Sequence, residues 1–282
     1  MKLEDYLARI GYDGAVVPDL GCLSAVHRQH LLSIPYENLD VQLGRPLDFD
    51  IERIFEKIVH RSRGGWCYEM NGLFAWALGE IGFEVTRMTG GVMRQVLGDD
   101  VLGNHLVLSV RLDGDPPDEL HLADVGLGNG MIEPTPLREG SFVQGHREMR
   151  LERLDGDLWR FQNFAGAVPP SFDFILAPAD ERRLEKSCEE LQSTPDSKFR
   201  QNLICERLRP EGVVFLLGRV LIRYDGSASN KRLLDSADEL AETLGECFGL
   251  SDPEVPDLWP RVAARHEEIF GDKTADEISF GS

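Results

Sequence analysis

The stretch RGGWCYEMNGLFAWALGEI, at residues 63–81, contains the clearest helical pattern in the chain. Its apolar residues recur at the spacing of a helix that buries one face: Met70, Leu73, Phe74, Ala77, Leu78 and Ile81. Gly82 follows them, and glycine commonly terminates a helix. The pattern therefore predicts a core helix whose first turn carries Cys67.

Helical spacing dominates before this helix, and strand-like runs dominate after it. Further helices are expected at residues 3–10, 26–34 and 51–61. Runs punctuated by Gly, Asp and Pro predict strands at residues 101–112, 119–125, 151–164 and 171–176. A mixed pattern follows, with helices expected at 181–192, 237–248 and 260–270 and strands at 213–224. The order of these elements predicts an α+β, multidomain fold. Its first part would be helical, its second part β-rich and barrel-like, and its third part a mixture of helices and strands.

The composition narrows the functional classes. The 282 residues carry 30 Lys and Arg against 49 Asp and Glu, a formal net charge of −19. So acidic a chain argues against binding nucleic acid or anionic membrane surfaces. No apolar run reaches the ~18 residues needed to span a bilayer, and the first residues do not resemble a signal peptide. Five scattered cysteines without a CxxC pair indicate neither a disulfide framework nor a zinc ribbon, so we expect a reduced, cytoplasmic protein.

Cys67 is the candidate nucleophile. A thiol attacks well only as a thiolate, which the amino end of a helix and a nearby imidazolium both favour. Gly64 and Gly65 precede it and permit a close approach to the backbone. The other four cysteines fit better as buried apolar residues.

His105 and Asp124 complete a candidate catalytic triad. The turn-forming residues 113–118 lie between their two predicted strands. In a hairpin centred near residue 114 or 115, the residue numbers of two paired positions add up to 229 or 230. His105 then lies opposite Asp124 or one step away. Such neighbours lie roughly 5 Å apart at Cβ, within reach of an imidazole–carboxylate hydrogen bond. The carboxylate would then orient the imidazole that takes the thiol proton.

Two alternatives use His121. As a rival base it is disfavoured because it lies on the opposite strand face from Asp124. A zinc site of Cys67, His105 and His121 is also disfavoured, because no closely spaced ligand pair supports it. We therefore expect no metal.

A glycine-rich loop at residues 126–130 follows Asp124 directly. Closely spaced glycines allow backbone N–H groups to face an anion, although the loop matches neither a dinucleotide-binding fingerprint nor a Walker loop. Next to a candidate catalytic aspartate, the loop is compatible with a pyrophosphate-bearing donor such as coenzyme A. The loop residues expected to contact it are Gly126, Gly128, Asn129 and Gly130. Arg207, Arg209 and Arg219 are further basic candidates.

These motifs resemble the arylamine N-acetyltransferase family. The segment RGGWCYE at residues 63–69 is close to that family's signature around its nucleophile, and its histidine and aspartate segments fall at His105 and Asp124. Residues 35–39, PYENL, resemble its PFENL motif, and residues 124–128, DVGLG, resemble its DVGFG motif. The resemblance spans residues 36 to about 137.

The resemblance implies a three-part architecture with a papain-like or transglutaminase-like core. The parts would be a helical bundle at 1–83 with the nucleophile, a β-barrel at 84–178 with His and Asp, and an α/β lid at 179–282. It also implies ping-pong acetyl transfer from acetyl-coenzyme A through Cys67 to an arylamine, hydrazine or arylhydroxylamine, as in xenobiotic metabolism.

Two residues depart from the family pattern. Tyr36 and Leu127 stand where the family usually has phenylalanines that line the acceptor pocket, and Phe199 is a third candidate for that pocket. These departures leave the preferred acceptor open. The sequence indicates no oligomeric state.

Three other functions share parts of this pattern. A macrolactam-forming amide synthase of the same fold would use the same triad with a carrier-bound acyl chain. A cysteine peptidase or transglutaminase-like hydrolase would also use Cys, His and Asp, but the glycine loop and the RGGWCYE segment argue against it. A non-catalytic binding protein is disfavoured because the triad is intact.

Overall fold

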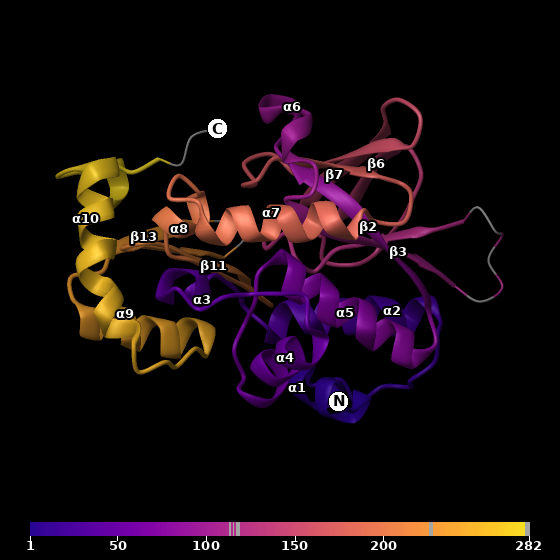
Figure 1. The fold of residues 1–282 in the computed structure, drawn as a ribbon, viewed down its shortest axis with the longest axis horizontal. Helices are drawn as coiled ribbons and strands as arrows, with labels where there is room; N and C mark the ends of the chain where they lie inside the picture. Colours follow the sequence, from indigo (N-terminus) through magenta and orange to yellow (C-terminus); the bar gives the residue numbers. More distant parts are fainter. Residues whose placement is uncertain (113, 115, 117–118, 226–227, 280–282) are drawn as a thin grey trace.

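The computed structural model describes residues 1–112, 114, 116, 119–225 and 228–279. The protein is α+β: two antiparallel sheets of eight and five strands are covered by helices. Figure 1 shows the first helices gathered beneath the larger sheet and the last helices at one end of the molecule. Among the described residues, no helix has the length and apolar character needed to cross a membrane.

Five helices precede the first long strand: α1 (Leu3–Ile10), α2 (Leu20–Ser33), α3 (Leu39–Leu43), α4 (Ile51–Phe55, continued by a π-helical turn over Glu56–His60) and α5 (Cys67–Ile81). The helix expected at residues 26–34 begins six residues earlier, because Asp19 accepts the backbone N–H of Cys22 at 2.8 Å and caps α2. The other expected helices are confirmed.

Helix α5 is the central element of the first core. All six residues of its predicted apolar face are buried, and Gly82 ends it in the left-handed conformation at φ 111°. Side chains of α1, α2 and α4 pack on it, as do Leu108 and Val110 from the larger sheet. The helix that begins at Cys67 is thus held between the other helices and the sheet.

The larger sheet has the strand order β5-β4-β3-β2-β9-β8-β7-β6. Its strands are β2 (Glu84–Val92), β3 (His105–Arg111), β4 (His121–Ala123), β5 (Thr135–Pro136), β6 (Gly140–Gln144), β7 (Arg147–Arg153), β8 (Leu158–Gln162) and β9 (Ser171–Ile175). Strand β3 starts at His105, later than expected, because residues Asp99–Val101 form a helical turn. β3 is buried on both faces, since Val107 faces the sheet's own core while Leu108 and Val110 face α5.

The larger sheet curls around a core of its own. Residues from β2, β3 and β4 share one cluster with Leu151, Phe161 and Phe172 from β7, β8 and β9, so the inner faces of both halves meet. Strands β5 and β6 are the two edges, and within the described residues they do not pair with each other. Between β2 and β3 lies a short helix, α6 (Arg94–Leu97).

The smaller sheet has the order β1-β10-β11-β12-β13. Its strands are β1 (Tyr36–Glu37), β10 (Ile204–Arg209), β11 (Gly212–Leu217), β12 (Val220–Tyr224) and β13 (Ser229–Leu233). The edge strand β1 comes from the N-terminal third of the chain and pairs Tyr36 with Glu206. The first and last thirds of the chain therefore share one sheet, which the sequence pattern did not predict.

The remaining helices follow the larger sheet or pack on the smaller one. They are α7 (Glu181–Ser193), α8 (Lys198–Gln201), α9 (Ala237–Thr243, continued by a π-helical turn over Leu244–Phe248) and α10 (Trp259–Phe270), with helical turns at Val255–Leu258 and Ala275–Glu277. Leu240, Phe248 and Val262 of this region form a third core with Leu216 and Leu221 of the smaller sheet. Figure 1 shows α9 and α10 at the end of the molecule away from β2 and β3.

Candidate active site

Cys67 lies at the first position of α5, next to the segment that carries β1. Glu37 donates its backbone N–H to the Gly65 carbonyl at 3.0 Å, and a Cβ at Gly64 would clash with the Pro35 carbonyl. The diglycine therefore permits a close approach, but the approaching segment is the chain's own β1. This contact holds Tyr36 beside the start of α5.

The Cys67 thiol is buried and lies against β3. Only 4% of the residue is exposed, and Sγ lies 3.7 Å from the carbonyl oxygen of Asn104, the residue before His105. Burial, followed by the nearby Cys188 and Asp124, raises the pKa of the thiol, while backbone N–H groups of Leu106 and Tyr68 oppose this. A thiolate at this position therefore requires a neighbouring base that takes the proton.

The structure brings His105 and Asp124 together. Nε2 of His105 lies 2.8 Å from Oδ2 of Asp124, and both side chains are about 1% exposed. Burial alone would raise the pKa of Asp124, but His105 and hydrogen bonds from Asn71 and Gly126 lower it overall. The carboxylate is thus charged, and it leaves Nδ1 as the ring nitrogen free to exchange a proton.

The predicted hairpin register was wrong. Ser109 pairs with Leu122 and Val110 with His121, so paired positions sum to 231. Asp124 lies one residue beyond the end of β4 and reaches His105 along the strands rather than directly across them. Of the predicted turn, residues 113, 115, 117 and 118 lie outside the described part of the chain.

Asn71 joins the helix of the candidate nucleophile to Asp124 and to the strand that begins at His105. It lies one turn after Cys67, and its Nδ2 donates to the Leu106 carbonyl at 2.6 Å and to Asp124 Oδ1 at 2.7 Å. Its Oδ1 accepts the backbone N–H of Val125 at 3.0 Å. Sequence reasoning missed this role, although the i+4 spacing from Cys67 was available as a signal.

His27 supports Asp124 from behind. The backbone N–H of Asp124 donates to His27 Nε2 at 3.2 Å, and His27 Nδ1 donates to the Ile132 carbonyl at 2.9 Å. Burial lowers the pKa of His27 to about 4, so the ring is neutral and keeps this tautomer at pH 7. Nothing in the local sequence indicated this contact, because His27 comes from α2.

In the glycine loop at residues 126–130, close packing within the protein itself requires glycine at two positions. A Cβ at Gly126 would lie 2.8 Å from Cys67 Cα, and one at Gly128 would clash with the Glu206 carboxylate. The N–H groups of Gly126 and Gly130 are used internally, by Asp124 Oδ1 and the Gly128 carbonyl. Fewer N–H groups therefore face outward than the sequence suggested.

The three predicted acceptor-pocket residues lie in two different clusters. Tyr36 and Phe199 pack against the cluster that contains Cys67, and Phe199 meets Trp66 edge to face at 5.4 Å. Leu127 is 9% exposed and packs with the core of the larger sheet. The structure thus places two of the three beside the thiol's cluster.

The three arginines considered as anion-binding groups bind the chain itself. Arg207 donates to the Leu32 carbonyl at 3.1 Å, Arg209 to the Cys247 carbonyl, and Arg219 to the Leu234 carbonyl at 2.8 Å. These side chains connect parts of the fold.

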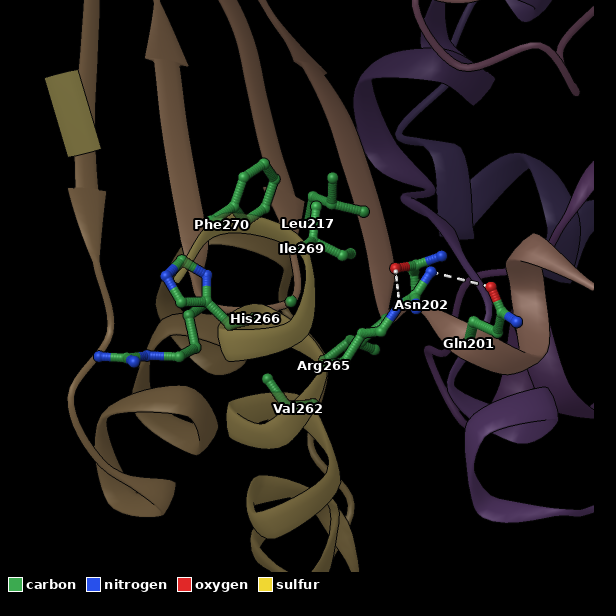
Figure 2. Close-up of a pocket in the computed structure, with 11 residues that line it drawn as sticks. Gln201, Asn202, Leu217, Val262, Arg265, His266, Ile269 and Phe270 are labelled. Atoms are coloured by element: carbon green, nitrogen blue, oxygen red, sulfur yellow. Dashed lines mark hydrogen bonds between the residues drawn. The ribbon is translucent and has the colours of Figure 1, made fainter. Parts of the chain in front are cut away.

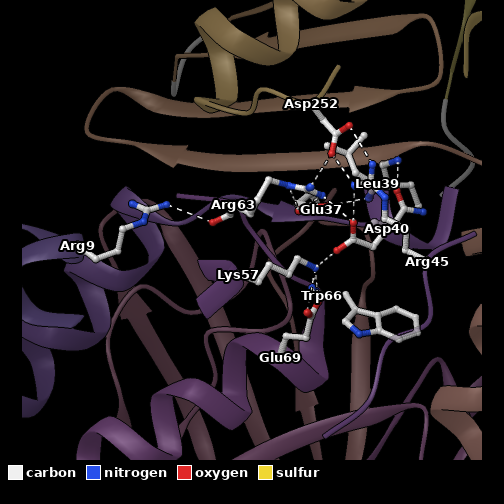
Figure 3. Close-up of polar contacts among 12 residues, drawn as sticks. Arg9, Glu37, Leu39, Asp40, Arg45, Lys57, Arg63, Trp66, Glu69 and Asp252 are labelled. Carbon is white, nitrogen blue, oxygen red and sulfur yellow. Dashed lines mark hydrogen bonds and ion pairs between the residues drawn. The ribbon is translucent and has the colours of Figure 1, made fainter. Parts of the chain in front are cut away.

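A buried ion network anchors the start of α5 (Figure 3). Lys57 lies 2.9 Å from both carboxylate oxygens of Glu69 and 2.8 Å from Asp40, and Glu69 accepts the backbone N–H of Trp66 at 3.3 Å. Arg63 bridges Glu37 and Asp40 and reaches Asp252 at 3.0 Å. The network therefore ties the turn before Cys67 to α3 and to the C-terminal third.

Other cavities lie away from the thiol. A cavity of about 10 Å³ between α8, β11 and α10 is lined by residues that include Arg265 and His266 (Figure 2), which is room for about one water. Larger hollows of about 420 Å³ and 700 Å³ lie beside Trp76 on α5 and beside Arg45. Within the described residues, none of these three is lined by a triad residue, and no cluster of His, Cys, Asp and Glu could hold a metal.

Comparison with known proteins identifies the family. A family model described as N-acetyltransferase matches residues 19–253. The arylamine N-acetyltransferase of Mycolicibacterium smegmatis is 37% identical over 93% of this chain and 98% of its own length. This chain belongs to the arylamine N-acetyltransferase family.

Solved structures of arylamine N-acetyltransferases share the fold. The M. smegmatis enzyme superposes with a TM-score of 0.83 at 34% identity, covering 94% of this chain and 98% of the other. The Mycobacterium marinum enzyme in complex with CoA gives 0.82 at 30% identity, covering 95% and 99%. The membership expected from the RGGWCYE segment is therefore confirmed.

Proposed function

We propose that this family member transfers the acetyl group of acetyl-coenzyme A to an arylamine or hydrazine through an acetyl-Cys67 intermediate. The observation that carries the proposal is the buried thiol at the start of α5, whose Sγ lies 3.7 Å from the backbone carbonyl of the residue before His105, while Nε2 of His105 lies 2.8 Å from a charged carboxylate. The CoA complex of the M. marinum relative supports the choice of donor.

The first half-reaction forms the acetyl-enzyme. His105 takes the thiol proton, Cys67 attacks the acetyl carbonyl carbon, and the C–S bond to coenzyme A breaks as His105 returns the proton to the leaving thiolate. The amino end of α5, whose first N–H groups have no partner within the helix itself, would stabilise the oxyanion. Asp124 holds the imidazole tautomer and stabilises the transient imidazolium.

The second half-reaction releases the product. The acceptor nitrogen attacks the thioester carbonyl, His105 takes the proton that the nitrogen loses, and the Cys67 thiolate leaves and is reprotonated. Anilines and hydrazines suit this step because their nitrogen is largely unprotonated at neutral pH. Tyr36 and Phe199 would line the acceptor site, with Leu127 behind the loop; Gly126, Gly128, Asn129 and Gly130 would approach coenzyme A.

We also propose the three-part layout with a papain-like or transglutaminase-like core. The support is a cysteine at a helix start that lies against β3 of a curled antiparallel sheet, with the histidine at the start of β3 and the aspartate just after the adjacent strand β4. The units would be 1–83, 84–178 and 179–282, with β1 exchanged into the last. We further propose a cytoplasmic location, because all five cysteines are free thiols.

Intact mass after incubation with acetyl-coenzyme A alone tests the mechanism. We expect one acetyl group on the parent protein, lost on adding an aniline, and none on Cys67→Ala. Cys188→Ala is the matched control, because Cys188 is a buried thiol in the same cluster, and it should still be acetylated. A folded parent that gains no acetyl group would overturn the proposal, and acylation only by a carrier-bound chain would indicate the amide synthase.

A further inference from the structure

Two polar side chains lie together at the edge of the smaller sheet next to Cys67. Tyr36 of β1 and Glu206 of β10 are direct cross-strand partners, so their side chains emerge on the same face. That face is turned toward the glycine loop, because a Cβ at Gly128 would clash with the Glu206 carboxylate. Tyr36 packs against the cluster that contains Cys67.

Both groups have unused hydrogen-bonding capacity. Within the described part of the chain, the Tyr36 hydroxyl makes no hydrogen bond, and the Glu206 carboxylate accepts the Asn129 backbone N–H but has no side-chain partner. Glu206 is nevertheless only 8% exposed. Buried polar groups normally use their hydrogen-bonding capacity, so the capacity that Glu206 keeps beside the half-buried Tyr36 and the glycine loop indicates a ligand contact.

The electrostatics agree with this geometry. Burial raises the pKa of Glu206 to about 8, although Arg147 and the Asn129 N–H oppose the shift. Burial, followed by Cys67 and Glu206, also raises the pKa of the Tyr36 hydroxyl. At pH 7 the pair is therefore mainly uncharged, and it offers oxygen acceptors to a neutral donor rather than an anion to a cation.

We propose that Tyr36 and Glu206 form a polar acceptor subsite that selects arylamines carrying a second, neutral hydrogen-bond donor, such as a ring hydroxyl or amino group. The inference rests on the proposed function and names its acceptor class. The aryl ring would lie between Phe199 and the glycine loop, with its reacting nitrogen toward acetyl-Cys67 and its second donor toward the pair.

The test compares 4-aminophenol with 4-methoxyaniline. The two substituents affect the reacting nitrogen similarly, but only the hydroxyl donates a hydrogen bond. Each acceptor is mixed with preformed acetyl-enzyme, and the ratio of their second-order deacetylation rate constants is measured. We expect the parent to favour 4-aminophenol by about 3- to 10-fold, the usual effect of one or two hydrogen bonds.

Three variants locate the preference. Glu206→Met removes both oxygens at similar volume and should bring the ratio close to 1, while Tyr36→Phe should lower it by about half or more. Glu206→Gln keeps a neutral oxygen acceptor and should retain most of the preference. Phe215→Leu alters the apolar neighbour of Glu206 on the next strand and should keep the parent ratio.

The outcomes separate this inference from the proposed function. A parent that forms no acetyl-enzyme would remove the function itself. An acetyl-enzyme whose ratio is the same in the parent, Glu206→Met and Tyr36→Phe would overturn the polar subsite alone. Because the ratio is internal to each variant, partial unfolding lowers both rates and cannot imitate the expected change.

Discussion

Asn71 makes the alignment of the triad depend on a single amide. It holds the Leu106 carbonyl, Asp124 and the Val125 N–H at once, so Asn71→Ala removes one hydrogen bond from each of three buried groups. We expect acetylation of Cys67 to slow by about 10- to 100-fold, in line with ~1–3 kcal/mol for a buried polar group left unpaired. Stopped acetylation reactions followed by mass would measure this, and an unchanged rate would refute the positioning role.

Gly126 should tolerate no side chain. A Cβ there would lie 2.8 Å from Cys67 Cα and 2.6 Å from Asn71 Nδ2, both inside the rigid triad support. Gly126→Ala should therefore displace the loop and reduce the acetylation rate by at least about 10-fold, as small misplacements at reacting centres do. Gly79→Ala, near the far end of α5, is the control, since a Cβ there would meet nothing within 4 Å. Equal losses in the two variants would contradict this explanation.

At the scale of elements, the start of α5 depends on a compensated set of buried charges. Lys57 is 5% exposed, and removing it alone would leave the Glu69 carboxylate buried without its cation. We expect Lys57→Met to lower the free energy of unfolding by about 3–5 kcal/mol. Urea unfolding measures this difference.

The matched double variant distinguishes charge from packing. Lys57→Met with Glu69→Gln removes both charges and keeps an oxygen for the Trp66 N–H, while Asp40 retains Arg63. It should recover part of the lost stability. The loss of unfolding free energy in the double variant is compared with the sum of the losses in the two single variants. A loss larger than this sum would contradict the explanation by charge compensation.

At the scale of the whole molecule, a buried neutral histidine connects α2 to the loop after β4. The pKa of His27 is lowered to about 4 in the folded protein, against 6.5 in an unfolded chain. Below pH 6.5 His27 is protonated in the unfolded chain but stays neutral in the folded protein. The contribution of the neutral His27 ring to the free energy of unfolding is therefore complete above about pH 6.5 and is lost as the pH falls toward 4. The full shift corresponds to about 3 kcal/mol.

Comparison with His27→Gln isolates this effect. Glu206 titrates in the opposite sense, because its pKa is raised, so the total stability has no simple trend between pH 5 and pH 7. The difference in unfolding free energy between the parent and His27→Gln should shrink by about 2 kcal/mol from pH 7 to pH 5. A difference that does not change with pH would show that His27 is not buried and neutral.

Local pattern was sufficient for most elements and for the family. The apolar spacing in residues 70–81 predicted α5, and the three motifs around Cys67, His105 and Asp124 pointed to the family that the comparisons confirm. Such features can be read from sequence because helix periodicity and motif residues depend on neighbours close in the chain. The start of α2 was misplaced because a cap at Asp19 lies outside the apolar repeat.

Long-range pairing decided what the sequence alone could not. The register of β3 and β4, the insertion of β1 beside β10, the support of Asp124 by Asn71 and His27, and the meeting of Tyr36 with Glu206 all join residues far apart in the chain. No local preference encodes these contacts, because they exist only once separate faces are buried against each other. The sequence by itself thus determined most of the long helices, the family and which residues are candidates for the triad, whereas the tertiary structure alone determined how these candidates are held and what lies beside them.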